Sequence, residues 1–272
     1  AVGRMALRVN TTGALNTALG HQALIANTTA SNNTAVGKDA LASNTTGANN
    51  TCVGLEAGKT LTTGDYNSFF GSEAGRNAVI TGDNNTGIGY ASGYSLTSGN
   101  NNAFLGLWSG FTTSTGSNNV AVGGYALRYN TTASQNTALG YSALTSNTTG
   151  ARNTALGHNA GEALTTADDN TLIGEAAGGY ITTGNDSVCV GRLAAGYSTQ
   201  LTTGTRGVYI GSYNTPSASN VTNEAVIGYG VTGKGGNTTF LQGTGGSFNG
   251  ANSSTFSTTS DRRIKKNIED NN

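Results

Sequence analysis

The chain has 272 residues and no formal net charge, and charged residues make up only 10% of it, against roughly 25% in an ordinary globular domain. With 42 glycines and few aromatic residues, it lacks the large side chains of a thick conventional core, yet it is not the proline-rich, highly charged mixture of a disordered protein. A neutral chain has no overall attraction for nucleic acid or anionic lipid, and no stretch approaches the roughly 18 apolar residues of a membrane span.

A repeat of 17 residues dominates the sequence. It is marked by glycines at 3, 20, 37, 54, 71, 89, 106, 123, 140, 157, 174, 191, 211 and 228, with one step of 18 residues and one of 20. Such self-similarity is typical of solenoid proteins. Two helices do not fit into 17 residues, and Asn, Thr and Gly are poor helix formers. The repeat therefore predicts stacked β-coils.

Each marker glycine ends a short segment such as NTALG at 16–20. Alternate residues of a strand face opposite ways, so Thr17 and Leu19 share one face and Ala18 and Gly20 the other. The residue before the glycine is always a large aliphatic residue or Phe, and we expect these residues to pack in one column. We expect the small residues of the other face to let another chain approach closely.

The second half of each repeat ends in turns such as NTTG at 44–47. We therefore predict an all-β protein, a parallel β-roll or β-solenoid of about fourteen coils, each with two short strands and two turns. Neighbouring coils would bury each other's faces, and hydrogen bonds would run along the long axis. At about 4.8 Å per coil, the rod would be roughly 60 Å long.

The two cysteines, Cys52 and Cys189, have no metal-ligand spacing with each other or with His21 and His158, and we interpret them as small buried apolar residues. They occupy the same repeat position eight coils apart, roughly 38 Å, which excludes a disulfide within the chain. Copies of one cysteine could still meet at the axis of a trimer.

The NTALG…AL…NTTG pattern over residues 1–232 resembles the head repeats of trimeric autotransporter adhesins, and more closely the related repeats of bacteriophage tail-fibre proteins. The resemblance implies a left-handed parallel β-roll and an intertwined homotrimer. The small residues at Ala18, Ala35, Ala121, Ala138 and Ala155 agree with close packing of chains.

The repeat fails after residue 232. Residues 233–258 are rich in Gly, Ser and Thr and are interpreted as a linker or an intertwined segment. Residues 259–272 contain SDRRIKKNI, which resembles the start of the self-cleaving intramolecular chaperone of phage tail spikes and fibres. The resemblance implies autoproteolysis at the Ser260–Asp261 bond, with Ser260 as nucleophile and Lys265 as its partner. A basic solvated tail is the alternative. Because so few residues follow Ser260, we expect cleavage only in a longer precursor.

Other candidate sites are weaker. Asp168, Asp169 and Asn170 lack the Gly and Glu of an EF-hand, so we predict no metal, and we predict no cofactor. The acidic residues are scattered and the coils too short to build a glycosidase cleft, so we do not expect an enzyme. The aromatic residues of the middle of the chain could bind sugars, but we expect them to fill the roll or the trimer axis: Tyr90, Tyr94, Trp108, Phe111, Tyr125 and Tyr129.

These observations predict a structural and adhesive rod of a phage tail fibre, located on the virion tail or otherwise extracellular. Its expected partners are two further copies of itself, a host-cell polysaccharide or protein receptor, and other tail or baseplate proteins. A bacterial trimeric autotransporter adhesin is the main alternative. An ice-binding solenoid, which needs one flat and regular Thr face, and a polysaccharide depolymerase are less favoured.

Overall fold

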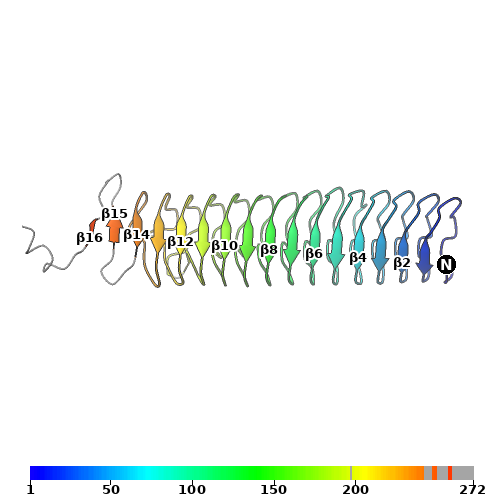
Figure 1. Cartoon of the computed structure of the whole chain (residues 1–272), viewed down its shortest axis with the longest axis horizontal. Coiled ribbons are helices and arrows are strands. Elements are labelled where there is room, and N and C mark those ends of the chain that lie inside the picture. Colours follow the sequence, from blue (N-terminus) through cyan, green and yellow to red (C-terminus); the bar gives the residue numbers. More distant parts are fainter. Residues whose placement is uncertain (197, 242–246, 250–256, 259–272) are drawn as a thin grey trace, which may run out of the picture.

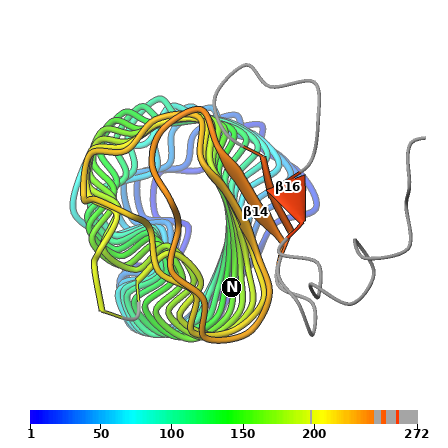
Figure 2. The same cartoon turned by 90° about the vertical axis from the view of Figure 1, so that its left-hand side faces the viewer.

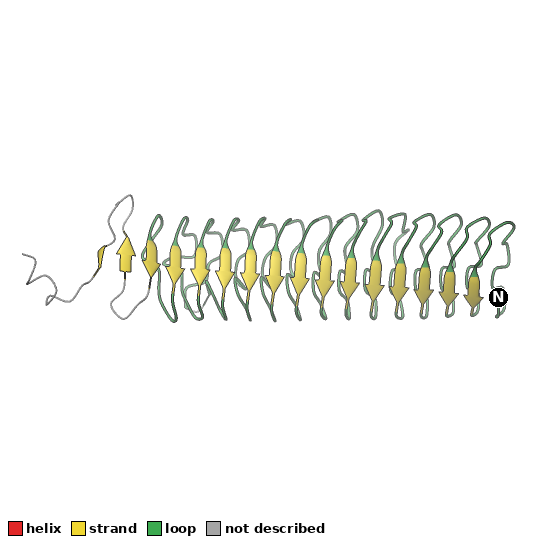
Figure 3. Cartoon of the chain, in the orientation of Figure 1, coloured by secondary structure: helices red, strands yellow, loops and turns green. Residues whose placement is uncertain are grey.

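The computed structural model describes residues 1–196, 198–241, 247–249 and 257–258, and these form a long, straight β-solenoid (Figure 1). All regular elements of the described residues are short strands joined by turns, with no helix among them (Figure 3). The chain advances by one coil at each repeat, so that the strand of each coil pairs with the strand of the next and all strands form one continuous sheet along the rod. The predicted all-β solenoid is confirmed.

The sheet follows the order of the sequence. Its strands are β1 (Thr17–Leu19), β2 (Thr34–Val36), β3 (Thr51–Val53), β4 (Ser68–Phe70), β5 (Thr86–Ile88), β6 (Ala103–Leu105), β7 (Val120–Val122), β8 (Thr137–Leu139), β9 (Thr154–Leu156), β10 (Thr171–Ile173), β11 (Val188–Val190), β12 (Val208–Ile210), β13 (Ala225–Ile227), β14 (Thr239–Leu241), β15 (Ser247–Asn249) and β16 (Ser257–Thr258). Strands β1 to β14 pair in parallel, whereas β15 and β16 pair antiparallel. The parallel stack thus extends one strand past residue 232.

The repeat positions stack in register, as predicted. Val36 lies opposite Val53, and Val53 lies opposite Phe70. Backbone hydrogen bonds connect each coil to its neighbours along the axis: Thr34 N–H donates to the Asn50 carbonyl and Gly37 N–H to the Leu19 carbonyl, each at 2.8 Å. Viewed along the axis, successive coils lie behind one another around a common interior, each slightly rotated from the last, with the strands along one wall (Figure 2).

Each coil contains one strand, not the two that we expected. After the strand, the residues two and four places beyond the marker glycine adopt a left-handed backbone conformation, for example Asp39 (φ 56°) and Leu41 (φ 50°). A strand cannot continue through such residues. The remaining sides of the coil are therefore successive turns, which still donate to the next coil, as Leu41 N–H does to the Ala57 carbonyl at 3.0 Å.

The marker glycine is required by its surroundings. Gly37 has a φ of 136°, and a Cβ there would lie 2.2 Å from the carbonyl oxygen of Gly54 in the next coil. The same approach recurs along the glycine column, for example between Gly140 and Gly157. Only a residue without a side chain allows the coils to approach this closely, which explains why the repeat is marked by glycine.

A ladder of asparagines, buried from Asn33 onward, closes the coils of β1 to β10. In one rung, Asn50 Nδ2 donates to the Gly64 carbonyl of its own coil at 2.8 Å, and Asn50 Oδ1 accepts from the backbone N–H of Asn67 in the next coil at 2.8 Å. Its rungs are Asn16, Asn33, Asn50, Asn67, Asn85, Asn102, Asn119, Asn136, Asn153 and Asn170. Burial of so many amides is tolerated because their hydrogen bonds are made. From the sequence, these residues were expected only to form turns.

The middle residue of each strand from β1 to β13 points into the coil and forms the inner column. Ala35, Cys52, Phe69 and Phe104 are all fully buried within their own coil. The expectation that this small-residue face lets another chain approach is therefore wrong. The interior of a coil with a 17-residue circumference is narrow, so this position is small in most coils, and the rings of Phe69 and Phe104 fit because Gly75 and Gly110 face them.

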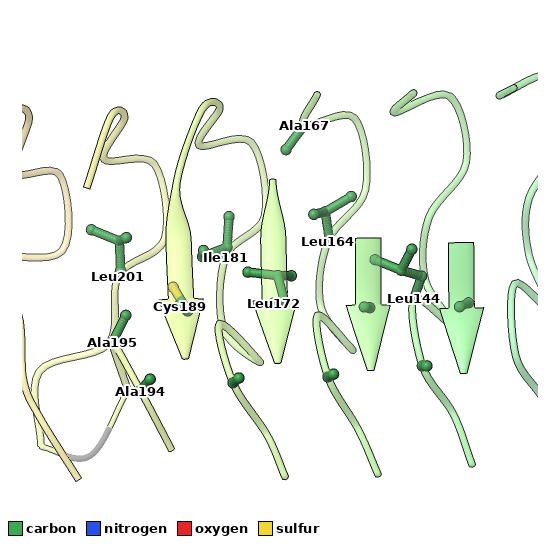
Figure 4. Close-up of a cluster of buried hydrophobic side chains, with 14 of the residues drawn as sticks. Leu144, Leu164, Ala167, Leu172, Ile181, Cys189, Ala194, Ala195 and Leu201 are labelled. Atoms are coloured by element: carbon green, nitrogen blue, oxygen red, sulfur yellow. The ribbon is translucent and has the colours of Figure 1, made fainter. Parts of the chain in front are cut away.

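Two combinations of side chains fill this interior. Some coils carry Leu and Asn, such as Leu41 with Asn44, and others carry Gly and Leu, such as Gly58 with Leu61. The backbone does not demand this glycine, because Leu41 adopts nearly the same φ (50° against 58°). Side-chain packing requires the glycine instead, since a Cβ at Gly58 would lie 2.4 Å from Cys52 Sγ. Figure 4 shows part of the resulting core, in which buried leucines, Ile181 and Cys189 lie inside successive coils.

Candidate functional site on the outer face of the coil

The residues predicted for autoproteolysis are Ser260, Asp261 and Lys265. All three lie in 259–272, outside the described residues. Their assignment remains a prediction from the sequence resemblance. The candidate sites that the structure does describe are surfaces of the rod.

The last residue of each strand from β1 to β13, together with Val2 in the first coil, points out of the coil and forms what we call the outer column. It consists of Val2, Leu19, Val36, Val53, Phe70, Ile88, Leu105, Val122, Leu139, Leu156, Ile173, Val190, Ile210 and Ile227. None of these side chains is buried, and Leu19 and Leu156 are 47% and 46% exposed. The predicted column of large apolar residues exists, but it faces outward.

The first residue of each strand shares this outer face. It is Thr in β1, β2 and β3, whereas Ala103, Val120 and Val188 take its place further along. The threonines therefore do not form the regular face expected of an ice-binding solenoid. The apolar outer column, in contrast, continues through β13.

A ladder of aromatic rings runs along a different side of the coil, formed by the turns after β5 to β9. Tyr94 stacks on Phe111 with ring centroids 4.8 Å apart, and Trp108 contacts both Phe111 and Tyr125, at 5.7 and 5.5 Å. Tyr125 in turn contacts Tyr141 at 5.3 Å, and Tyr141 stacks on His158 at 5.6 Å. We call these six residues the aromatic ladder.

The aromatic ladder lies outside the coil, so the expectation that such residues fill the roll is wrong, whereas the other possibility, that they fill a trimer axis, stays a prediction. The aromatic side chains that do fill the roll are Phe69, Phe104 and Tyr209 of the inner column. Arg128, which the sequence analysis did not single out, lies among the rings, with its guanidinium carbon 4.5 Å from the Trp108 centroid and 4.8 Å from that of Tyr129. Its position in the same repeat as Tyr125 and Tyr129 could have pointed to Arg128 in the sequence.

The acidic cluster at 168–170 has structural partners. Asp169 Oδ1 accepts from Arg152 Nε at 2.7 Å, and this pairing lowers the pKa of the Asp169 carboxyl. Asp168 Oδ1 accepts from the Ala151 backbone N–H, and Asn170 belongs to the buried asparagine ladder. Over the described part of the chain, no group of three or more His, Cys, Asp or Glu side chains could hold a metal ion.

Both cysteines are free thiols inside their own coils, as expected for small buried residues. Burial raises the pKa of Cys52 well above its ordinary value, and raises that of Cys189 to about 12. Because both side chains point into the inner column, they do not face a neighbouring chain, and the idea that copies of one cysteine meet at a trimer axis is wrong.

Comparison with known proteins gives no match: no family model, no curated protein and no solved structure is significantly similar to this chain. In the described residues, nothing folds into a helix with the length and apolar character needed to cross a membrane. The geometry of the outer surfaces and the sequence resemblance therefore carry the functional argument.

Proposed function

We propose that this chain is a rod segment of a trimeric phage tail fibre, exposed on the virion, with a mechanical and adhesive role and no enzymatic activity of its own. The observation that supports it is the unbroken outer column. At roughly 40 Å² for each of fourteen side chains, the column exposes on the order of 500 Å² of apolar surface in one line, at the upper end of what a monomeric protein leaves uncovered.

Parallel copies of the chain are the partners that best match this surface. A straight column that repeats with the period of the coils is matched along its whole length only by a surface with the same period, and another copy provides one. Three copies around a shared axis would bring three outer columns together. The number three comes from the sequence resemblance to tail fibres and adhesins.

The outer column supports a fibre and a bacterial surface adhesin equally well, because both require parallel copies. The fibre is favoured by the segment SDRRIKKNI, which resembles the start of the fibre chaperone. Within this proposal, host-cell receptors and other tail proteins are the partners, and self-cleavage at Ser260–Asp261 belongs to the precursor.

The mass of the protein in solution tests the proposed assembly. Light scattering should give three times 27.3 kDa for the native chain. Replacing Leu105 and Val122 together with Glu places charges in the outer column and should give a folded monomer, because two carboxylates per chain would be buried without partners. The matched control is Thr115→Glu, on an exposed turn of the same rod, which should stay trimeric.

A native chain that is monomeric would overturn the assembly, as would a double variant that remains trimeric. The chaperone junction is tested separately with a chain that continues beyond residue 272. Such a precursor should be processed, and Ser260→Ala should abolish processing. Processing that persists in Ser260→Ala would show that the cleavage assignment is wrong.

A further inference from the structure

The aromatic ladder has an unusual electrostatic setting. Residues 84–161, which include all six residues of the ladder, contain no Asp or Glu. Besides the aliphatic side chains of the outer column and Leu107, the side chains exposed there include rings, hydroxyls and amides, and the cations of this stretch are Arg128 and Arg152. Arg152 is paired with Asp169 in the next coil. Arg128 is thus the cation without a carboxylate in this part of the rod.

Equivalent positions in earlier coils show which carboxylate is missing beside Arg128. Lys59 and Arg76 occupy the repeat position of Arg128 in earlier coils. There, Lys59 Nζ lies 3.1 Å from Glu56 Oε1 and Arg76 Nη1 lies 2.9 Å from Glu73 Oε1, in each case three residues earlier. Three residues before Arg128 the chain has Tyr125 instead. The same position therefore carries a paired cation in two coils and an unpaired one in this coil.

Rings hold Arg128 in place. Its guanidinium carbon is 4.5 Å from the Trp108 ring centroid, 5.2 Å from that of Tyr125 and 4.8 Å from that of Tyr129. Its Nε is buried without a hydrogen-bond partner, and its side chain makes no ion pair within the described residues. A guanidinium stacked on rings is weakly hydrated and pre-oriented, and its fork of donors matches a carboxylate.

Exposed rings flank this cation. Tyr129 is 44% exposed and Tyr141 52% exposed, and both lie next to the ring cluster around Arg128. The apolar face of a pyranose packs against such rings, while tyrosine hydroxyls and nearby amides bind its hydroxyl groups. An anionic group on the same sugar would supply the missing partner of Arg128 through charge-assisted hydrogen bonds.

We infer that this surface, with Arg128 at its centre and Tyr129 and Tyr141 at its edges, binds a glycan that carries carboxylate groups. The carboxylate accepts hydrogen bonds from Arg128, and adjoining sugar rings pack on the tyrosines. The inference rests on the proposed adhesive function and names the chemical class of its receptor. It predicts that attachment weakens as salt is added, because one contact is ionic.

Trp108 allows a direct test, because it is the single tryptophan of the chain and touches the Arg128 guanidinium. The native protein is titrated with polysialic acid and with polygalacturonate, and in parallel with neutral dextran, while Trp108 fluorescence is recorded. We expect a saturable change with at least one acidic polysaccharide and none with dextran. Arg128→Gln should weaken binding at least tenfold, and Tyr141→Ala several-fold.

Two variants serve as matched controls. Arg206 is an exposed arginine away from the ladder, and Tyr66 is a 60% exposed tyrosine in an earlier turn. Arg206→Gln and Tyr66→Ala should bind as the native chain does. If Arg206→Gln and Arg128→Gln lost the same affinity for the acidic polysaccharide, the binding would be a general attraction of opposite charges, and the proposed site would be overturned.

Failure of this inference can be separated from failure of the proposed assembly by measuring the mass of each sample. A trimer that binds neither acidic polysaccharide overturns the glycan site and leaves the assembly standing. A monomer that binds one overturns the assembly alone. If Arg128→Gln or Tyr141→Ala changes the mass, the surface lies between copies of the chain, and the glycan site is overturned.

Discussion

The inner and outer columns are built from the same three-residue strands, but they obey different constraints. Inner positions change with the volume that their coil must fill, from Gly87 to Phe104 in adjacent strands. Outer positions change little, since every one is aliphatic or Phe although none is buried within the chain. The inner column is constrained by the fold, and the outer column by something outside the coil, which is the reason to assign it to assembly.

Adjacent phenylalanines in β4 provide the sharpest test of this difference. Phe69 is fully buried, whereas Phe70 is 38% exposed. Phe69→Ala should cost about 4 kcal/mol of unfolding free energy, because it empties the core, whereas Phe70→Ala should cost under about 1 kcal/mol in the monomer. Both losses are measured by urea unfolding of the monomeric double variant Leu105→Glu and Val122→Glu, into which Phe69→Ala or Phe70→Ala is introduced. Equal losses would contradict the inside-outside assignment.

The asparagine ladder is the next largest contribution to test. Asn153→Ala removes the acceptor of the Asn170 backbone N–H and the donor to the Ala167 carbonyl. Leaving these buried groups unpaired should cost about 3 kcal/mol. Amide exchange at Asn170 should accelerate accordingly, while the exposed Asn220→Ala leaves it unchanged. An unchanged exchange rate in Asn153→Ala would mean that water replaces the side chain without loss.

The two ways of filling a coil should be interconvertible. Gly161→Leu alone should cost about 2 kcal/mol, because a Cβ there would lie 2.6 Å from Leu172 Cδ1, and Leu164→Asn alone about 3 kcal/mol. Together they should cost at least about 1 kcal/mol less than their sum. The new amide at 164 would also supply a donor for Asn147 Oδ1, which is buried without a partner. Thermal unfolding of the two singles and the double measures the coupling, and strict additivity would refute it.

The smallest expected effect concerns the thiols of the inner column. The pKa of Cys189 rises from an ordinary value of 9.0 to about 12 because the thiol is buried. The unfolded thiol ionises above pH 9 and the folded one does not, so its contribution is complete below pH 9 and is lost as pH rises toward 12. At pH 10 the loss is about 1.4 kcal/mol. Cys189→Ala introduces the residue that many other coils have at this position. It should remove this part of the fall in unfolding free energy between pH 9 and 12, measured by denaturant titration at each pH, and an unchanged fall would contradict the prediction.

Sequence reasoning succeeded where periodicity carries the information. The in-register stack of Val36, Val53 and Phe70 follows from the 17-residue spacing alone. It failed for the direction of the strand faces, because a period of two shows which residues share a face but not which face is inside. Comparing Ala18 with Leu19 by size favours Leu for the core, yet the narrow coil admits Ala.

Two further features could not be predicted for related reasons. The single strand per coil depends on left-handed residues such as Leu41, and leucine gives no sign of that conformation. The surroundings of Arg128 depend on contacts between coils, since Trp108 lies twenty residues away in sequence. The asparagine ladder could have been found, because an Asn precedes nearly every strand at the same repeat position.

The axial direction of the backbone hydrogen bonds has a mechanical consequence for a rod that transmits force. Tension along the axis loads every boundary between coils equally, so the weakest boundary sets the force at which the rod yields. The asparagine ladder ends at Ser187, where a 3.3 Å contact from the Gly207 N–H to a hydroxyl replaces an amide rung. Under load, we expect the solenoid to part first on the C-terminal side of β11, where the amide rungs have ended, leaving the coils on the N-terminal side wound.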